Sequence, residues 1–237
     1  MHSHNCYELI FFLKGDATHV IENRKYKLSK NDLIIIKPSC YHYIQINENT
    51  DYERYDITIN ADLLGIENID LVSNEIEVIN LSANPIAIEL FAKLDYYKKK
   101  LSENDFNKVA VLLIKELFYN LTTYKEQSKN YTFLSPTLTT ALAYINDNLF
   151  TLKDVEEIAK HLFITQSYLF RIFKQELKTS PKKYINDKRL LAAQNMLSVG
   201  KNPLEVFETC GFNDYTTFYR SYVKFFGHAP SKEKSLK

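Results

Sequence analysis

The chain has 237 residues, 45% of them hydrophobic and 25% charged, which is typical of globular proteins and sufficient for one large domain or two small ones. No apolar run approaches the roughly 18 residues of a membrane-spanning helix, and the start lacks the pattern of a signal peptide. The three cysteines are odd in number and widely spaced, which argues against a disulfide framework. We therefore expect a cytoplasmic protein with no membrane partner.

Charge is unevenly distributed along the chain. Residues 135–237 contain 15 Lys and Arg against 10 Asp and Glu, whereas residues 1–134 contain 15 against 19. A basic half joined to an acidic half indicates nucleic acid binding by the basic half. Chance segregation of solvated charge would give the same asymmetry.

Residues 7–60 show the pattern of short β-strands. Turn signals such as Lys14-Gly15-Asp16 and Pro38-Ser39 separate apolar or alternating runs, at roughly the 8–12-residue spacing of a small barrel or sandwich. The runs cover residues 7–13, 19–21, 33–36, 41–46 and 55–59. Residues 61–82 are harder to assign, and one or two more strands are expected there, with 76–79 as the best match.

The hydrophobic period changes to that of helices at Pro85. One helix is predicted over 86–100 and a second over 105–124, followed by a polar linker at 125–130. The second helix is apolar on two sides, at Val109, Leu112, Leu113, Ile114, Leu117 and Leu121. Its extra apolar face indicates a dimer interface, although covering the barrel alone would also use these residues.

From Ser135 onward the pattern is that of short helices. One helix is predicted over 136–148, and another begins at Thr151, which we expect to be its N-cap. Thr165 and Asp214 are the expected N-caps of two further helices, and Pro181 and Pro203 each fit the start of another.

This C-terminal part contains one pattern twice. The segment 157–174 resembles the segment 205–224, and the matched residues are 48 apart before the turn and 49 apart after it, so the second copy has one extra residue near its turn. Each copy predicts a short helix, a tight turn and a longer amphipathic helix, which is the helix-turn-helix plan. The matching pairs are Ile158 and Val206, Leu169 and Phe218, Arg171 and Arg220, and Phe173 and Tyr222.

The second helix of each copy has a predicted core face and a predicted DNA face. We expect Leu169, Phe173, Phe218 and Tyr222 to be buried. An exposed Arg on such a helix can bond to guanine edges or phosphates, and two units in one rigid domain would enter successive major grooves about 34 Å apart. A generic solvated face would explain one copy, but two copies with Arg at the same place favour DNA. The predicted DNA contacts are Gln166, Ser167, Phe170, Arg171, Lys174, Tyr215, Thr216, Tyr219, Arg220 and Lys224.

Five segments carry a specific resemblance. They are SYLFRIFK at 167–174, SPKKYI at 180–185, KRLLAAQNML at 188–197, GFNDYTTFYR at 211–220 and FGHAPS at 226–231. Together they make residues 135–230 resemble the DNA-binding domain of the AraC/XylS family of transcription regulators. The resemblance implies seven helices with a central helix at 181–198, and base contacts by Ser167, Phe170, Arg171, Thr216 and Arg220.

The chain departs from the family pattern at several positions. Phe163 and Lys178 stand where glycine is usual, and Phe207 stands where a small alanine is usual. The end Pro-Ser-Lys-Glu lacks the common aromatic-Arg pair. Phe207 bears most directly on the packing of the second helix-turn-helix.

The N-terminal half carries a second resemblance. His2-x-His4, Glu8 and Gly15, followed by Pro38-Ser-Cys-Tyr-His42, resemble the two motifs of the cupin barrel. In metal-dependent cupins the corresponding His and Glu residues hold a divalent metal, whereas regulators use the barrel for a small effector. We predict no metal and no other cofactor, and leave open a purely structural role for these histidines. The predicted effector-binding residues are His4, Glu8, His19, Tyr41 and His42.

The sequence therefore predicts an α+β chain. Residues 1–124 form a cupin-like effector-binding and dimerisation domain (barrel about 1–82, helices about 85–124), residues 125–134 a linker and residues 135–237 a double helix-turn-helix domain. The expected function is transcription regulation, as an activator and not an enzyme. The expected partners are double-stranded DNA, a small effector such as a sugar, RNA polymerase and a second copy of the chain. The alternatives are a metal-dependent cupin enzyme with a nucleic-acid module, and an architectural DNA binder without an effector.

Overall fold

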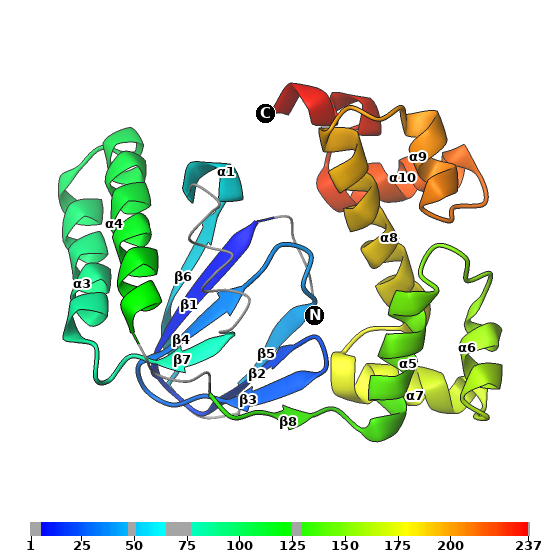
Figure 1. The fold of residues 1–237 in the computed structure, drawn as a ribbon, viewed down its shortest axis with the longest axis horizontal. Coiled ribbons are helices and arrows are strands. Elements are labelled where there is room, and N and C mark those ends of the chain that lie inside the picture. Colours follow the sequence, from blue (N-terminus) through cyan, green and yellow to red (C-terminus); the bar gives the residue numbers. More distant parts are fainter. Residues whose placement is uncertain (1–5, 47–50, 65–76, 125–128, 237) are drawn as a thin grey trace. The chain divides into compact units, whose positions relative to one another are not determined.

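The computed structural model describes residues 6–46, 51–64, 77–124 and 129–236, which divide into two compact units. The N-terminal unit contains residues 2–132 and the C-terminal unit residues 133–237. Strands dominate the first unit and helices the second, which confirms the predicted α+β class (Figure 1). No helix in these ranges is long and apolar enough to cross a membrane.

The strands of the N-terminal unit form two four-stranded sheets. One sheet has the order β6-β1-β4-β7, with β6 (Glu53–Ile59), β1 (Tyr7–Lys14), β4 (Asp32–Ile36) and β7 (Val78–Asn80). The other has the order β5-β2-β3-β8, with β5 (His42–Ile46), β2 (Ala17–Ile21), β3 (Arg24–Lys27) and β8 (Thr132–Phe133). Strands β6 and β5 lie at the edges of separate sheets, so the expected cupin-like barrel is open, as two packed sheets, in the part of the chain described.

Strand β1 is covered on both faces. Leu9 and Phe11 belong to a core shared with α3 (Pro85–Lys100) and α4 (Glu103–Thr123), whereas Ile10 and Phe12 belong to a core between the two sheets. The layers are thus helices, sheet and sheet (Figure 1). Since both faces are buried, β1 and β4 are continuous apolar runs rather than alternating ones.

The two helices of this unit agree with their sequence signals. Asn84 caps α3, accepting a bond from Ala87 N, and Ser102 caps α4, accepting one from Asp105 N. A four-residue helix, α1 (Ala61–Leu64), follows β6, and β7 confirms the strand expected near residue 79, although Ile76 lies outside the described residues.

Part of the predicted linker is bound to the N-terminal unit. The Lys129 ammonium lies 2.5 Å from Asp32 Oδ2 and 3.0 Å from Ser29 Oγ, and Lys129 N donates to Val78 O at 2.6 Å. The Asp32 side chain is completely buried. A buried carboxylate is stable only when it is paired, so this ion pair holds residue 129 against the sheets.

The C-terminal unit consists of six α-helices and a terminal 3-10 helix within residues 133–236. They are α5 (Pro136–Asp147), α6 (Val155–His161), α7 (Gln166–Leu177), α8 (Pro181–Ser198), α9 (Pro203–Thr209), α10 (Tyr215–Phe226) and η1 (Pro230–Leu236). The implied central helix at 181–198 is confirmed as α8. The prediction that Thr151 is an N-cap is wrong: Asp154 caps α6, accepting a bond from Glu157 N at 3.0 Å, whereas Thr151 Oγ1 donates to Asn148 O at 3.1 Å and stabilises the preceding turn.

Candidate DNA-binding surface and effector pocket

Two helix-turn-helix units, α6–α7 and α9–α10, correspond to the two copies of the repeat. The second helix of each, α7 or α10, is its predicted recognition helix. Thr165 Oγ1 accepts a hydrogen bond from Tyr168 N at 3.2 Å, and Asp214 Oδ1 accepts one from Thr217 N at 2.8 Å. Both predicted N-caps are confirmed, and each supplies an acceptor that the first turn of a helix lacks. The bonds from Thr217 hold the pKa of Asp214 below its usual value, so this cap is a carboxylate at neutral pH.

The core faces of both recognition helices lie as expected. Leu169, Phe173, Phe218 and Tyr222 are buried. Phe207, where the family usually has alanine, is half-buried, and its ring lies 5.7 Å from the Tyr215 ring and 6.5 Å from the Phe218 ring. This aromatic cluster accommodates the larger residue within the second unit.

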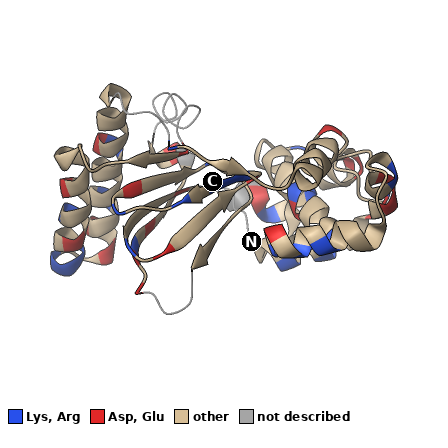
Figure 2. Cartoon of the chain, turned by 90° about the horizontal axis from the view of Figure 1, so that it is seen from below, with Lys and Arg blue, Asp and Glu red and all other residues tan. Residues whose placement is uncertain are grey.

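The predicted DNA face lies on the opposite side of each helix. Of its ten residues, all are exposed except Tyr215, which is half-buried in the aromatic cluster. The Arg171 guanidinium lies 5.0 Å from the centre of the Tyr168 ring, a cation–π contact that supports the side chain at the surface. Lys and Arg are interspersed with Asp and Glu on the helices (Figure 2). The structure thus exposes Arg171 and Arg220 at equivalent positions.

Two departures from the family pattern lie in turns. Phe163 has φ 55° and Lys178 has φ 54°, the left-handed region that glycine adopts most easily. The backbone therefore keeps the conformation that a glycine would favour, although neither residue is glycine.

In the N-terminal unit, Glu8 and His42 meet between the sheets. Glu8 Oε2 lies 2.9 Å from His42 Nε2, and both side chains are buried. His42 Nδ1 lies 3.1 Å from Cys40 O. A neutral His42 imidazole can donate to Glu8 through Nε2 or, as the other tautomer, to Cys40 O through Nδ1. A pair with two such proton arrangements can donate to or accept from a ligand.

The other predicted effector residues are only partly brought together. The His19 ring lies 5.9 Å from the His42 ring, on the neighbouring strand β2. Tyr41 is buried just before β5, and its N–H donates to Glu22 Oε1 at 2.8 Å. His4, together with His2, lies outside the described residues. Within those residues, no group of three or more His, Cys, Asp or Glu side chains is arranged to hold a metal ion.

Strand β6 adds charged residues that the sequence analysis missed. The register pairs Glu8 with Thr58 and Ile10 with Asp56, so Asp56 shares the inter-sheet face. Arg54 Nη2 lies 2.6 Å from Asp56 Oδ2, and Arg54 Nη1 donates to Tyr52 Oη at 3.0 Å. The Asp56 side chain is 37% exposed, and its partial burial, then the nearby Glu8, raises its pKa. We call Glu8, His19, His42, Arg54 and Asp56 the inter-sheet polar cluster.

A sequence signal for Arg54 and Asp56 existed. From residue 54 to residue 59, charged or polar side chains alternate with Tyr55, Ile57 and Ile59. An alternating strand has one apolar and one polar face, and the polar face of an edge strand is normally assigned to solvent. Only the position of the second sheet shows that this face turns toward Glu8.

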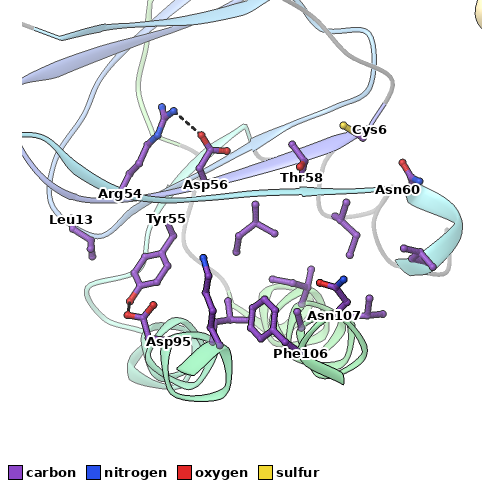
Figure 3. Close-up of a pocket in the computed structure, with 18 of the residues that line it drawn as sticks. Cys6, Leu13, Arg54, Tyr55, Asp56, Thr58, Asn60, Asp95, Phe106 and Asn107 are labelled. Carbon is purple, nitrogen blue, oxygen red and sulfur yellow. Dashed lines mark hydrogen bonds and ion pairs between the residues drawn. The ribbon is translucent and has the colours of Figure 1, made fainter. Parts of the chain in front are cut away.

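The other face of β6 borders a groove of about 790 Å³ against α3 and α4. Tyr55 Oη donates to Asp95 Oδ2 at 2.6 Å, and burial together with this bond raises the pKa of Tyr55 to about 12. Figure 3 shows Tyr55 directed toward the helices, whereas Arg54 and Asp56 point away from them. The Arg54 and Asp56 side chains therefore point to the face of β6 opposite the helices, although both residues also line the groove.

Comparison with known protein families covers both units. A model described as an AraC-like ligand binding domain matches residues 1–67, and one described as a helix-turn-helix domain matches residues 158–235. Their order along the chain is that of the two units. In both units the chain is similar to AraC-family transcription regulators.

The similar proteins fall into two groups, those matched over most of their length and those matched over a part. The lactose operon transcription activator of Staphylococcus xylosus is 23% identical over 90% of this chain and 78% of that protein. The transcriptional activator RhaS of Mannheimia succiniciproducens is 21% identical over 97% of this chain and 87% of that protein. The regulator ArgR of Pseudomonas aeruginosa is 33% identical, over 42% of this chain and 31% of that protein. Like ArgR, three further relatives are matched over less than half of their own length, so the chain spans less than half the length of these four proteins.

Proposed function

We propose that this chain is a transcription regulator that binds double-stranded DNA through α7 and α10. The observation that carries the proposal is the repeated recognition helix, capped by Thr165 or Asp214 and exposing Arg171 or Arg220 at the same place. Arginine at that position can donate two hydrogen bonds to a guanine edge. The other predicted contacts on these helices remain part of the proposal.

The proposal includes a small-molecule effector bound at the inter-sheet polar cluster. Binding sites for small molecules combine apolar walls with a few convergent polar groups. Here Arg54 supplies donors, Asp56 supplies acceptors, and the Glu8–His42 pair supplies either, against walls that include Ile10 and Phe12. This mixture suits the hydroxyl groups of a sugar. Relatives named as regulators of lactose and raffinose operons support that ligand class.

We further propose an activator that acts in the cytoplasm, contacts RNA polymerase and has no enzymatic activity. The relatives named as activators support this role. An effector can regulate such a protein only by favouring one arrangement of the chain over another. The residue-129 ion pair with Asp32 offers one physical link from the sheets to the connection between the units.

We also propose that the chain forms a homodimer through α4. On α4, the helix predicted to have two apolar sides, Leu113, Ile114, Leu117 and Leu121 cover the sheet. Leu112 is 65% exposed and Tyr119, seven residues later, is 60% exposed. Residues seven apart share one side of a helix, so two exposed apolar side chains, separated by Lys115 and Glu116, remain on that side for a second copy.

Selection of genomic DNA fragments by the purified chain tests the main proposal. Enrichment of a shared site that spans two successive major grooves is the expected result. Lack of enrichment at moderate salt would contradict it. Elemental analysis of the same sample provides a check, since bound metal with substrate turnover would instead support the cupin-enzyme alternative.

A further inference from the structure

Arg189, in the middle of α8, is bonded to both helix-turn-helix units. Its Nε donates to Leu149 O at 2.8 Å and its Nη2 to Leu152 O at 2.6 Å, both in the connection from α5 to α6. Its Nη1 donates to Gly211 O at 2.7 Å, in the turn between α9 and α10. One rigid, planar guanidinium thus joins the segment that leads into the first unit to the turn of the second.

Gly211 lies directly against the same connection. A Cβ atom at this position would come closer than 3.0 Å to Phe150 O and would lie 3.1 Å from Arg189 Cζ. Gly211 also has φ 77°, which a side chain disfavours. The turn of the second helix-turn-helix therefore packs directly against the backbone of the segment that leads into the first, and only glycine permits this approach.

The position of Arg189 along α8 matters. Before it, Tyr184 packs edge-on against Phe173 of α7. After it, Leu190, Ala193 and Leu197 share a core with α9 and α10. Arg189 thus stands where the core of the first unit gives way to the core of the second.

Arg189 is not placed as a DNA contact. It is half-buried, and three of its N–H groups are directed at backbone carbonyls. With Gly211 it lines a groove of about 810 Å³ that is also lined by Gln166 and Phe170 of α7 and by Thr217 of α10. The bonds of Arg189 therefore lie between the two recognition helices.

We propose that Arg189, seated against Gly211, is a positioning residue that fixes the separation of α7 and α10. This inference rests on the proposed DNA-binding function. If the two units are held rigidly, only DNA whose two half-sites have one separation satisfies both helices. If they can pivot, sites with altered separations are bound almost as well. Arg189 thus determines specificity for half-site spacing without touching a base.

The test uses the full chain and DNA duplexes in which one or two base pairs are added or removed between the half-sites of the selected site. Each base pair shifts a half-site by about 3.4 Å along the axis and rotates it around the duplex. The wild type should lose about tenfold or more in affinity per base pair changed. Arg189→Met and Gly211→Ala should bind the original site more weakly and show a nearly flat spacing profile.

Lys188→Met is the matched control. It removes a cation from the adjacent residue of α8, whose ammonium lies 5.7 Å from the centre of the Tyr184 ring. Its spacing profile should match that of the wild type. A wild-type profile in Arg189→Met would overturn the positioning role while leaving the proposed function intact. Absence of any DNA binding by the wild type would overturn both.

A distance measurement without DNA tests the positioning role independently of the proposed DNA-binding function. Spin labels at Lys174→Cys and Lys224→Cys, in a chain with Cys6 and Cys40 changed to Ser, report the distance between α7 and α10. The wild-type background should give one narrow distance distribution, and Arg189→Met a broad one. An equally narrow distribution in a folded Arg189→Met chain would contradict the inference, and Gly211→Ala offers a second variant should Arg189→Met fail to fold.

Discussion

Phe163 and Gly211 occupy the same place in the two helix-turn-helix turns and share a left-handed backbone, with φ 55° and 77°. The hydrogen bonds around them also correspond: Ile164 N donates to Ala159 O, and Phe212 N donates to Phe207 O, both at 3.0 Å. The left-handed conformation costs a residue with a side chain about 1–2 kcal/mol. Phe163 is 96% exposed, so burial of its side chain does not offset that cost.

Phe163→Gly should therefore stabilise the C-terminal unit. The strain relieved, less the greater freedom of glycine in the unfolded chain, gives an expected gain of about 0.5–1 kcal/mol in the free energy of unfolding. Urea denaturation measures it. Phe163→Ala is the matched control, because it removes the ring and keeps the strain, and it should change stability little. A loss of stability in Phe163→Gly would show that the exposed ring makes stabilising contacts.

Asp56 makes the stability of the N-terminal unit depend on pH. Burial and Glu8 raise its pKa above the ordinary value of 3.8, so the folded chain holds this proton to higher pH than the unfolded chain does. Stability from this group is present at low pH and is lost as pH rises from 3.8 through the raised pKa. The Asp56→Asn variant has no carboxyl group at this position, so it does not lose this stability as pH rises. Its free energy of unfolding, relative to wild type, should increase between pH 3.8 and neutral pH in urea denaturation. A difference that is constant with pH, or that falls, would contradict this explanation.

Lys129→Met should destabilise the N-terminal unit. It leaves the buried Asp32 carboxylate with bonds from Ser29 N and Asn80 Nδ2 but without its cation. We expect a loss of about 1–3 kcal/mol in the free energy of unfolding. The double variant Asp32→Asn/Lys129→Met should recover part of this loss, because no buried charge remains. A double variant as unstable as the sum of the two single changes would indicate that the ion pair itself contributes little.

Leu112→Asp should abolish the proposed dimer without unfolding α4. Leu112 is exposed, so a charge there costs the monomer little, whereas a charge within an apolar interface is unfavourable. Sedimentation at micromolar concentration should show a dimer for the wild type and a monomer for the variant. Ile86→Asp, at a residue that is 56% exposed on α3, is the matched control and should remain dimeric. A wild type that sediments as a monomer would rule out this interface.

Sequence reasoning succeeded where the structure depends on local spacing. Leu169 and Phe173 lie four residues apart, as do Phe218 and Tyr222, and this spacing alone identified the buried faces of α7 and α10. Thr165 and Asp214 could be predicted as N-caps because each directly precedes a helical pattern. Thr151 was misassigned because Asp154, also a good N-cap, follows three residues later.

Sequence reasoning failed where distant segments meet. Strand count and turn spacing indicate a barrel or a sandwich but not whether it closes, because closure depends on pairing between edge strands, which no local pattern specifies. The place of Arg54 and Asp56 beside Glu8 could not be predicted for the same reason. Arg189 lies in a segment that carried the family resemblance, yet its bonds to Leu149 and Gly211 span 40 and 22 residues and could not be predicted from spacing.

The most direct test of the DNA-binding proposal compares Arg171→Ala and Arg220→Ala with the wild type on the selected DNA site. Both side chains are exposed, so neither change should alter folding, and thermal unfolding checks this. Each change should cost about 1–3 kcal/mol of binding free energy and relax base preference within its own half-site. If both variants bind the site with wild-type affinity and base preference, α7 and α10 are not its recognition helices.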